Sequence, residues 1–233
     1  MRPRRLTFLL LAPALLVLAK ACTTDTAAPA ASTSWTPTTL ADSVAQAHGY
    51  EHWDDVRRLE FTFAVDVDDT TRTSREWVWY PQRDSVVRIV GDDTVGYTRG
   101  GTLAADATRA DEQFVNDTYW LLMPFYGVWS AAGYSPTVRR GVTMPLSRKP
   151  ATMLTVAYGP DGGYTPGDAY DLYLDADYRL REWTFRKGGQ PSPTMVMSWE
   201  GYRPAEGLLL PTEHRGEGPV RIHHPRVAVY ATE

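Results

Sequence analysis

The sequence lacks two features that would constrain its fold and its relation to a membrane, namely paired cysteines and a long apolar run. Cys22 is the single cysteine among 233 residues. One cysteine cannot form an internal disulfide, so the fold must be held by its own core. The longest uncharged apolar run, Leu6–Leu18, has thirteen residues, which is too few to span a hydrocarbon layer about 30 Å thick. These absences exclude a disulfide-stapled scaffold and argue against a helix that crosses a bilayer.

The N-terminus has the pattern of an export signal. Three arginines within the first five residues precede Leu6–Leu18, and the small residues Ala19 and Ala21 follow. A basic start, a short apolar core and small residues at the end are typical of a cleaved signal peptide. We therefore predict a signal peptide over residues 1–21.

Cys22 lies directly after this segment and allows two interpretations. Leu18 to Cys22 resemble the lipobox of bacterial lipoprotein precursors, in which a cysteine is acylated and becomes the mature N-terminus. The leucine is one position early, and Lys20 is unusual there. Ala19-Lys20-Ala21 also suits an ordinary signal peptidase, which would leave a soluble protein with a spare thiol. We favour lipidation at Cys22, because the only cysteine stands at the required position.

The charge balance excludes nucleic acid as a partner. Removal of residues 1–21 takes away four basic and no acidic residues, so the formal net charge falls from −4 to −8. An acidic domain has no electrostatic footprint for nucleic acid and little attraction to anionic membranes. Attachment to a membrane would therefore depend on the lipid at Cys22, since acyl chains contribute about 0.8 kcal/mol per buried methylene.

Composition divides the rest of the chain into a tether and one domain. Residues 23–37 are almost entirely Thr, Ala, Ser, Pro and Asp, so with Cys22 they form a predicted flexible tether, 22–37. Residues 38–233 have globular composition and suffice for a single domain. Within it, apolar spacing predicts a helix over Thr39–His48 that stops at Gly49. A second helix is expected over Asp106–Met123, ended by Pro124.

Most of the domain shows the two-residue period of strands. In Leu59–Val67, apolar and polar residues alternate, which places an aromatic-rich face inward. Short polar turns separate similar runs and favour an antiparallel meander over βαβ units. We expect a mainly β (α+β) fold, a curved antiparallel sheet or incomplete β-barrel of about ten strands with helices on its concave face. The other predicted strands are Arg75–Tyr80, Ser85–Val90, Tyr170–Leu174, Arg179–Lys187 and Met195–Trp199.

Catalytic motifs are largely missing. There is no G-x-S-x-G elbow, Walker loop or G-x-G-x-x-G. His48 to His52 matches the zinc-binding string H-x-x-E-H, but Gly49 weakens a helix there and no third ligand motif follows. His223 and His224 would point to opposite faces of a strand and could not chelate one ion. Asp66, Asp68 and Asp69 suit a solvated turn better than a calcium site. We expect no enzyme, no cofactor and no metal.

Large apolar side chains are abundant, with eight Trp, thirteen Tyr, six Phe and six Met. A broad curved sheet can leave a cavity that its own side chains do not fill, and methionine adapts to floppy chains. The inward faces of the predicted elements therefore supply candidates for an apolar groove, against the alternative that they only form the core. These candidates are Phe61, Phe63, Trp77, Trp79, Phe114, Leu121, Trp183, Phe185, Met195, Met197 and Trp199.

The order of these features resembles a family of uncharacterised bacterial envelope lipoproteins. The likeness covers about residues 40–232 and is most specific at Asn116–Phe125, with further similarity in Asp171–Asp175 and Trp199–Thr212. Such proteins resemble the lipoprotein carriers LolA and LolB, in which an incomplete antiparallel barrel with a helical lid shelters acyl chains. The resemblance implies a LolA-like fold, but no membrane-inserting or hand-over residue of the carriers maps onto this chain.

Three functions are compatible with these observations. The first is a non-catalytic, periplasm-facing lipoprotein, expected to be a monomer, that binds lipid acyl chains or lipoproteins in an apolar groove. The second is a structural or protein-interaction lipoprotein of the envelope with a filled core. The third, which we favour least, is a hydrolase of envelope polymers, and it would need a tight cluster of Asp, Glu or His in a cleft.

Overall fold

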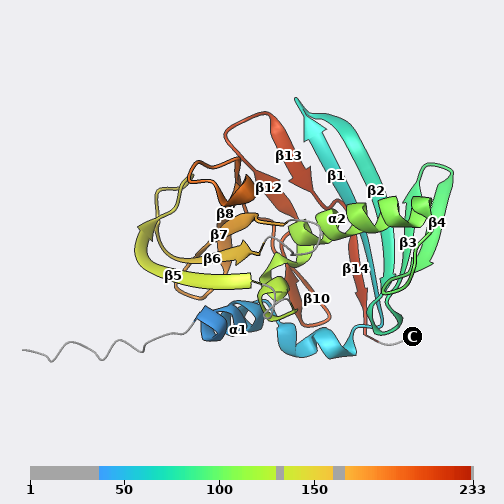
Figure 1. Cartoon of the computed structure of the whole chain (residues 1–233), viewed down its shortest axis with the longest axis horizontal. Helices are drawn as coiled ribbons and strands as arrows, with labels where there is room; N and C mark the ends of the chain where they lie inside the picture. The colour runs from blue at the N-terminus through green and yellow to red at the C-terminus, as the bar shows by residue number, and fades with distance from the viewer. Residues whose placement is uncertain (1–36, 130–133, 160–165, 232–233) are drawn as a thin grey trace, which may run out of the picture. The chain divides into compact units, whose positions relative to one another are not determined.

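The computed structural model describes residues 37–129, 134–159 and 166–231 (Figure 1). The predicted signal peptide, Cys22 and the tether up to residue 36 lie outside these ranges.

A hairpin of two long strands shows how the sequence pattern becomes structure. Strand β1, Arg58–Val67, pairs with β2, Thr70–Tyr80. Asp68 and Asp69 between them both have positive φ, 50° and 57°, as a two-residue hairpin turn requires.

The described strands form two large antiparallel sheets and one small hairpin. The first sheet has seven strands in the order β12-β13-β1-β2-β3-β4, with β14 also paired to β1. The second has five strands in chain order, β5 to β9, and β10 and β11 form the hairpin. The remaining bounds are β3 Ser85–Val90, β4 Asp93–Thr98, β5 Tyr134–Thr143, β6 Pro150–Tyr158, β7 Ala169–Leu174, β8 Leu180–Arg186, β9 Met195–Ser198, β10 Arg203–Ala205, β11 Leu208–Leu210, β12 Glu213–Arg215, β13 Val220–His223 and β14 Val227–Tyr230.

The expected fold class is confirmed, with more strands than the sequence pattern indicated. Fourteen strands are present in the described residues, against about ten expected, because several late ones have only three or four residues. Among the described residues, one isolated bridge connects the two large sheets, from Glu200, just after β9, to Glu213 of β12. At the other end, β4 and β5 do not pair with each other in the part of the chain that the structure describes. The barrel is therefore incomplete, as a strongly twisted sheet of this width tends to split rather than stay continuous.

Helix α1, Pro37–Ala47, confirms the first predicted helix, and Gly49 follows it with φ 83°. Helix α2, Ala105–Trp129, is longer than predicted: Pro124 lies inside it, so the expectation that Pro124 ends the helix is wrong. Proline removes one backbone hydrogen bond and strains the preceding turn, at a cost of about 3 kcal/mol. Burial after the proline offsets this cost, because Phe125 and Trp129 pack on Trp53 with ring centroids 5.7 and 4.9 Å away.

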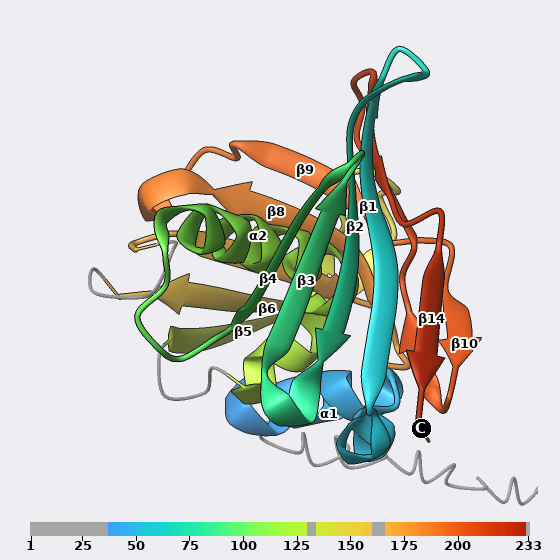
Figure 2. The ribbon, with the colours of Figure 1, turned by 90° about the vertical axis from the view of Figure 1, so that its right-hand side faces the viewer.

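Helix α2 makes contact with both large sheets. In Figure 1 it runs across the view between the strands of the two sheets, and Figure 2 shows it behind β1–β4, beside β8 and β9. Phe114 packs edge-on against Trp77 and Trp79 of the first sheet. One and a half turns later, Trp120 packs against Trp183 of the second sheet, with centroids 4.9 Å apart. None of the helices in the described residues combines the length and apolarity needed to cross a membrane.

Gly49 should be the most sensitive glycine of the fold. A Cβ atom built on Gly49 would lie 2.1 Å from the carbonyl oxygen of Gly207, and its φ of 83° disfavours other residues. We expect Gly49→Ala to lower the free energy of unfolding by about 2 kcal/mol or more, measured by urea denaturation. Gly100→Ala is the matched control, since Gly100 has φ 84° but open space around it. Equal losses in both variants would show that backbone strain, and not the close approach to Gly207, sets the cost.

Candidate functional site

A cavity lined mainly by aromatic residues lies between α2 and the second sheet; a larger one, of about 650 Å³, is lined mostly by polar and charged residues such as Lys149, Arg181 and Glu182. The cavity beside α2 has a volume of about 440 Å³, within the range of about 300–1,000 Å³ typical of small-molecule sites. Strands β7, β8 and β9 form one wall and α2 the other, with Trp199 following β9. The lining residues are Glu112, Val115, Asn116, Tyr119, Trp120, Asp168, Tyr170, Trp183, Phe185, Met195 and Trp199.

One stripe of α2 supplies the helical wall. Glu112, Val115, Asn116, Tyr119 and Trp120 are spaced at i, i+3, i+4, i+7 and i+8, so they lie on one side of the helix. Glu112 and Asn116 are exposed, Val115 and Tyr119 are half-buried, and Trp120 is buried. The helix therefore runs from the solvent-exposed opening of the cavity into its floor.

Three near-parallel rings cover the opposite wall. Tyr170 of β7 lies 5.3 Å from Phe185 of β8, at an interplanar angle of 23°. Trp183 lies 6.0 Å from Phe185 at 16°. The rings of Trp183 and Phe185 share a face because alternate residues of a strand point the same way. Such a wall offers flat aromatic surface with little polar character.

The opening of the cavity is partly apolar and partly acidic. Met195 is 38% exposed and is one of two large hydrophobic side chains with this much exposure in the described residues. Glu112 on α2 and Asp168 before β7 contribute the carboxylates. Asp168 Oδ1 accepts a hydrogen bond from the Gly188 amide at 2.7 Å, which holds it at the edge of the second sheet. Among the lining residues, none is lysine or arginine.

Tyrosine hydroxyls complete the polar groups near the cavity. The hydroxyls of Tyr119 and Tyr158 are hydrogen-bonded at 2.6 Å, and the Tyr119 ring lies 4.1 Å from that of Tyr126. Burial, reinforced by the neighbouring Tyr158, raises the pKa of Tyr119 well above its usual range. The hydroxyl therefore stays protonated and acts as a hydrogen-bonding group, not as a base.

The structure separates the predicted groove residues into two groups. Trp183, Phe185, Met195 and Trp199 line the cavity. The other seven are buried at 8% exposure or less and pack into the core: Phe61, Phe63, Trp77, Trp79, Phe114, Leu121 and Met197. The helical stripe that begins at Glu112, together with Asp168 and Tyr170, lines the cavity without having been predicted. The spacing of this stripe is visible in the sequence, but the stripe through Phe114 and Leu121 is more apolar and is therefore the stronger candidate from sequence alone.

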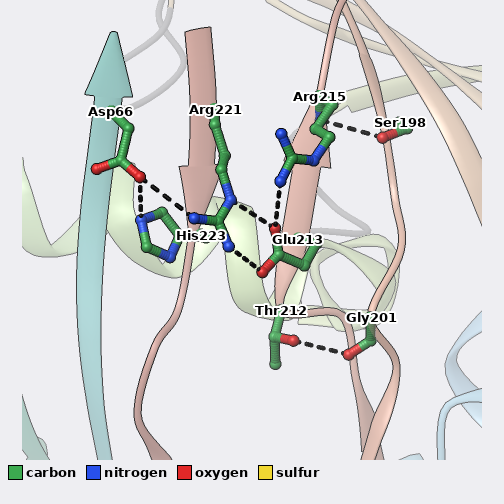
Figure 3. Close-up of polar contacts among 8 residues, drawn as sticks. All are labelled: Asp66, Ser198, Gly201, Thr212, Glu213, Arg215, Arg221 and His223. Atoms are coloured by element: carbon green, nitrogen blue, oxygen red, sulfur yellow. Dashed lines mark hydrogen bonds and ion pairs between the residues drawn. The ribbon is translucent and has the colours of Figure 1, made fainter. Parts of the chain in front are cut away.

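A second polar cluster joins three strands of the first sheet (Figure 3). Arg221 of β13 lies between Asp66 of β1 and Glu213 of β12, at 3.3 and 2.6 Å. His223 Nε2 is 2.9 Å from Asp66, and Thr71 donates a hydrogen bond to the same carboxylate at 2.8 Å. The Thr71 bond is the main cause that lowers the pKa of Asp66, and Arg221 does the same for Glu213.

This ionic cluster is suited to holding three strands of the first sheet together and not to catalysis. Its carboxylates stay ionised and are neutralised by arginine, so they are poorly suited to proton transfer near neutral pH. A cavity of about 250 Å³ adjoins Asp66, Asp68 and Asp69, and it is lined mainly by polar residues and the Gly216–Val220 loop. Thr212 and Gly201, also drawn in Figure 3, are hydrogen-bonded at 2.7 Å where the two sheets meet.

The two histidines of the H-x-x-E-H string, His48 and His52, have different surroundings and do not form a metal site. His48 Nδ1 is 2.7 Å from the Val44 carbonyl oxygen, and Nε2 is 3.3 Å from the Tyr202 hydroxyl. His52 is exposed and follows in the 3₁₀ turn Tyr50–Asp55. Both nitrogens of His48 thus have protein partners, and the described residues contain no cluster of three His, Cys, Asp or Glu side chains able to hold a metal.

Comparison with known proteins gives similarity of fold only. The sequence matches no protein-family model and no curated protein. Similar solved structures include a LolA superfamily protein from Nitrosomonas europaea (TM-score 0.48, 8% identity, covering 83% of this chain and 94% of the other). A DUF1329 family protein from Desulfovibrio piger has TM-score 0.46 and 10% identity, with 83% and 91% covered. A domain from Vibrio parahaemolyticus, assigned to outer membrane lipoprotein sorting, has TM-score 0.46 and 9% identity, with 82% and 91% covered.

Proposed function

We propose that this protein is a non-catalytic module of the bacterial cell envelope that binds an acyl chain in the cavity beside α2. The observation that carries the proposal is the cavity itself, about 440 Å³ in volume and walled mainly by aromatic rings. Burial of an acyl chain is driven by removal of apolar surface from water and needs no directional polar groups. An acyl group on Cys22 would tether the domain to a membrane and leave it facing the periplasm.

The depth of the cavity supports a chain-shaped ligand. Met195 and Phe185 stand toward the opening, whereas Trp183 and Trp199 are 6% and 1% exposed. A chain entering past Met195 would therefore pass from a partly exposed zone into one bordered by buried aromatic rings. The alternative of an envelope protein with a filled core predicts no space of this size, so the cavity favours the binding function.

Native mass spectrometry tests the proposal directly. The full-length chain carrying Cys22→Ser would be exported to a bacterial periplasm and purified without detergent. We expect an added mass that organic extraction identifies as an acyl lipid, or uptake of an added lipid when the chain is purified empty. A clean protein mass that does not change on titration with neutral and charged acyl lipids would reject the binding function.

A cavity-filling variant should remove binding while the fold remains. Val115 lines the cavity from α2 and is half-buried, so Val115→Trp would occupy the space that the chain needs. We expect lipid affinity to fall at least about tenfold, because the indole displaces much of the buried chain. Val90→Trp is the matched control, since Val90 is 40% exposed on β3, outside the cavity. Equal affinities of the two variants would place the lipid elsewhere, and circular dichroism would verify that both remain folded.

A further inference from the structure

We propose that the cavity selects single-chain amphiphiles with a cationic head group, such as a quaternary ammonium, and discriminates against carboxylates. This inference rests on the proposed function and names the ligand class of the same site. It depends on the arrangement of charge and aromatic rings at the opening of the cavity, and on its size.

Among the described residues that line the cavity, the two charged ones, Glu112 and Asp168, are both acidic. Glu112 approaches from α2 and Asp168 from the strand side, so two carboxylates come from opposite walls. Arg186, the last residue of β8, directs Nε and Nη2 to Asp171 at 2.9 and 3.0 Å and Nη1 to the Gly189 carbonyl. Those bonds commit the guanidinium to partners outside the cavity lining. A carboxylate head group would therefore meet like charges, whereas a cation would be attracted.

The aromatic walls add a second reason for a cation. Tyrosine and tryptophan faces attract a positive charge through their ring quadrupole, and quaternary ammonium groups are bound by aromatic walls in this way. Tyr119 from α2 and Tyr170 from β7 have ring centroids 5.7 Å apart near the two walls, and Trp183 lies 5.6 Å from Tyr170. These rings are in contact with one another, so a head group at their level would lie over the aromatic surface that they share, with the carboxylates of Glu112 and Asp168 also in the cavity lining.

The volume limits the number of chains. At about 440 Å³, the cavity lies toward the lower end of the range for small-molecule sites. One chain can be sheltered there, but the several chains of a mature lipoprotein or a diacyl phospholipid cannot be enclosed together. The ligand class that satisfies charge, aromatic surface and volume is a single-chain cationic or choline-type amphiphile.

The test compares three probes of equal chain length that differ in head charge. Dodecyltrimethylammonium, dodecanoate and neutral dodecyl maltoside would be titrated below their micelle concentrations into the full-length Cys22→Ser chain. Fluorescence of Trp120, Trp183 and Trp199, which line the cavity, reports binding. We expect the ammonium probe to bind at least about tenfold more tightly than dodecanoate, from charge and cation–π contributions together.

Removal of the two carboxylates should reduce this preference. Glu112→Gln with Asp168→Asn keeps the side-chain shapes, and asparagine retains an oxygen that can accept the Gly188 hydrogen bond. We expect the ratio of ammonium to carboxylate affinity to fall to about threefold or less, with a smaller change in maltoside affinity than in ammonium affinity. The control is Glu51→Gln with Asp92→Asn, which removes the same charge at two exposed positions outside the cavity lining.

Each outcome separates the two proposals. Equal affinity of all three probes would overturn the charge preference and leave the acyl-binding function intact. A preference that the control variant reduces as much as the cavity variant would also overturn it, because net charge and not the site would be responsible. If no probe binds and none displaces a co-purified lipid, both proposals fail.

Discussion

Between pH 7.5 and pH 5 the protein should lose on the order of 6 kcal/mol of its free energy of unfolding, because three histidines, His48, His214 and His224, are buried in the neutral form. Burial lowers the pKa of His48 and of His214 to about 4, partly offset by hydrogen bonds with backbone carbonyls. Burial also lowers the pKa of His224 well below its usual value, and the neighbouring His214 adds to the effect. Their rings lie 6.0 Å apart in the core of the domain.

The direction of this pH dependence follows from the pKa values of the histidines in the folded and unfolded states. Above pH 6.5 both states are neutral at these sites, so the histidines cost nothing. Below pH 6.5 the unfolded chain binds protons that the folded protein excludes, and stability falls until the pH approaches the folded pKa near 4. Asp66 and Glu213, whose pKa values are lowered, contribute stability that is lost only below about pH 4.5, so their effect lies in a separate window.

Urea denaturation at four pH values between 7.5 and 5, followed by fluorescence, measures this loss. His224→Phe should reduce the dependence on pH by about one proton, about 1.4 kcal/mol per pH unit, because phenylalanine suits a pocket bordered by Phe61 and Phe63. His52→Gln is the control at an exposed histidine. A stability that stays constant from pH 7.5 to 5 would contradict the assignment of buried neutral histidines.

The second large effect should come from Arg75. Its guanidinium forms two hydrogen bonds of 2.7 Å with Asp117, whose side chain is fully buried and also accepts from Trp77 Nε1 at 2.8 Å. Burial raises the pKa of Asp117, and the pair with Arg75 opposes that rise. Arg75→Met removes the compensation and leaves a buried carboxylate beneath β2. We expect a loss of about 3–5 kcal/mol in the free energy of unfolding, measured by urea denaturation at pH 7.5.

A double variant distinguishes the loss of a pair from the loss of packing. Arg75→Met with Asp117→Leu removes both charges, so most of the stability should return. Arg226→Met is the control for an exposed pair: Arg226 is 2.6 Å from Glu60 but its side chain is 60% exposed, and its loss should cost less than about 1 kcal/mol. Similar losses in the single and double variants would mean that Arg75 stabilises the sheet by packing alone.

The predicted fold rests on patterns that act locally. The alternation of Leu59–Val67, the turn at Asp68 and the stop at Gly49 each follow from backbone geometry within a few residues, and the structure has all three. Pro124 shows the limit of such reasoning. Its penalty is local, but the burial of Phe125 and Trp129 that offsets it comes from Trp53, more than seventy residues earlier.

By itself, the sequence determined which faces of its strands and helices are apolar, because the spacing of apolar residues, every two residues in a strand or every 3.6 in a helix, is a property of the sequence alone. Only the tertiary structure decided which of those faces is covered. Phe61 and Trp77 have their space filled by neighbouring side chains, including Phe114 of α2 against Trp77, whereas Trp183 and Phe185 border a cavity. Both pairs show the same apolar alternation in the sequence. Whether the space beside them is filled depends on the volume and position of residues from a different element. Periodicity carries no information about that volume, and so the candidate site could be listed only as part of a larger apolar set.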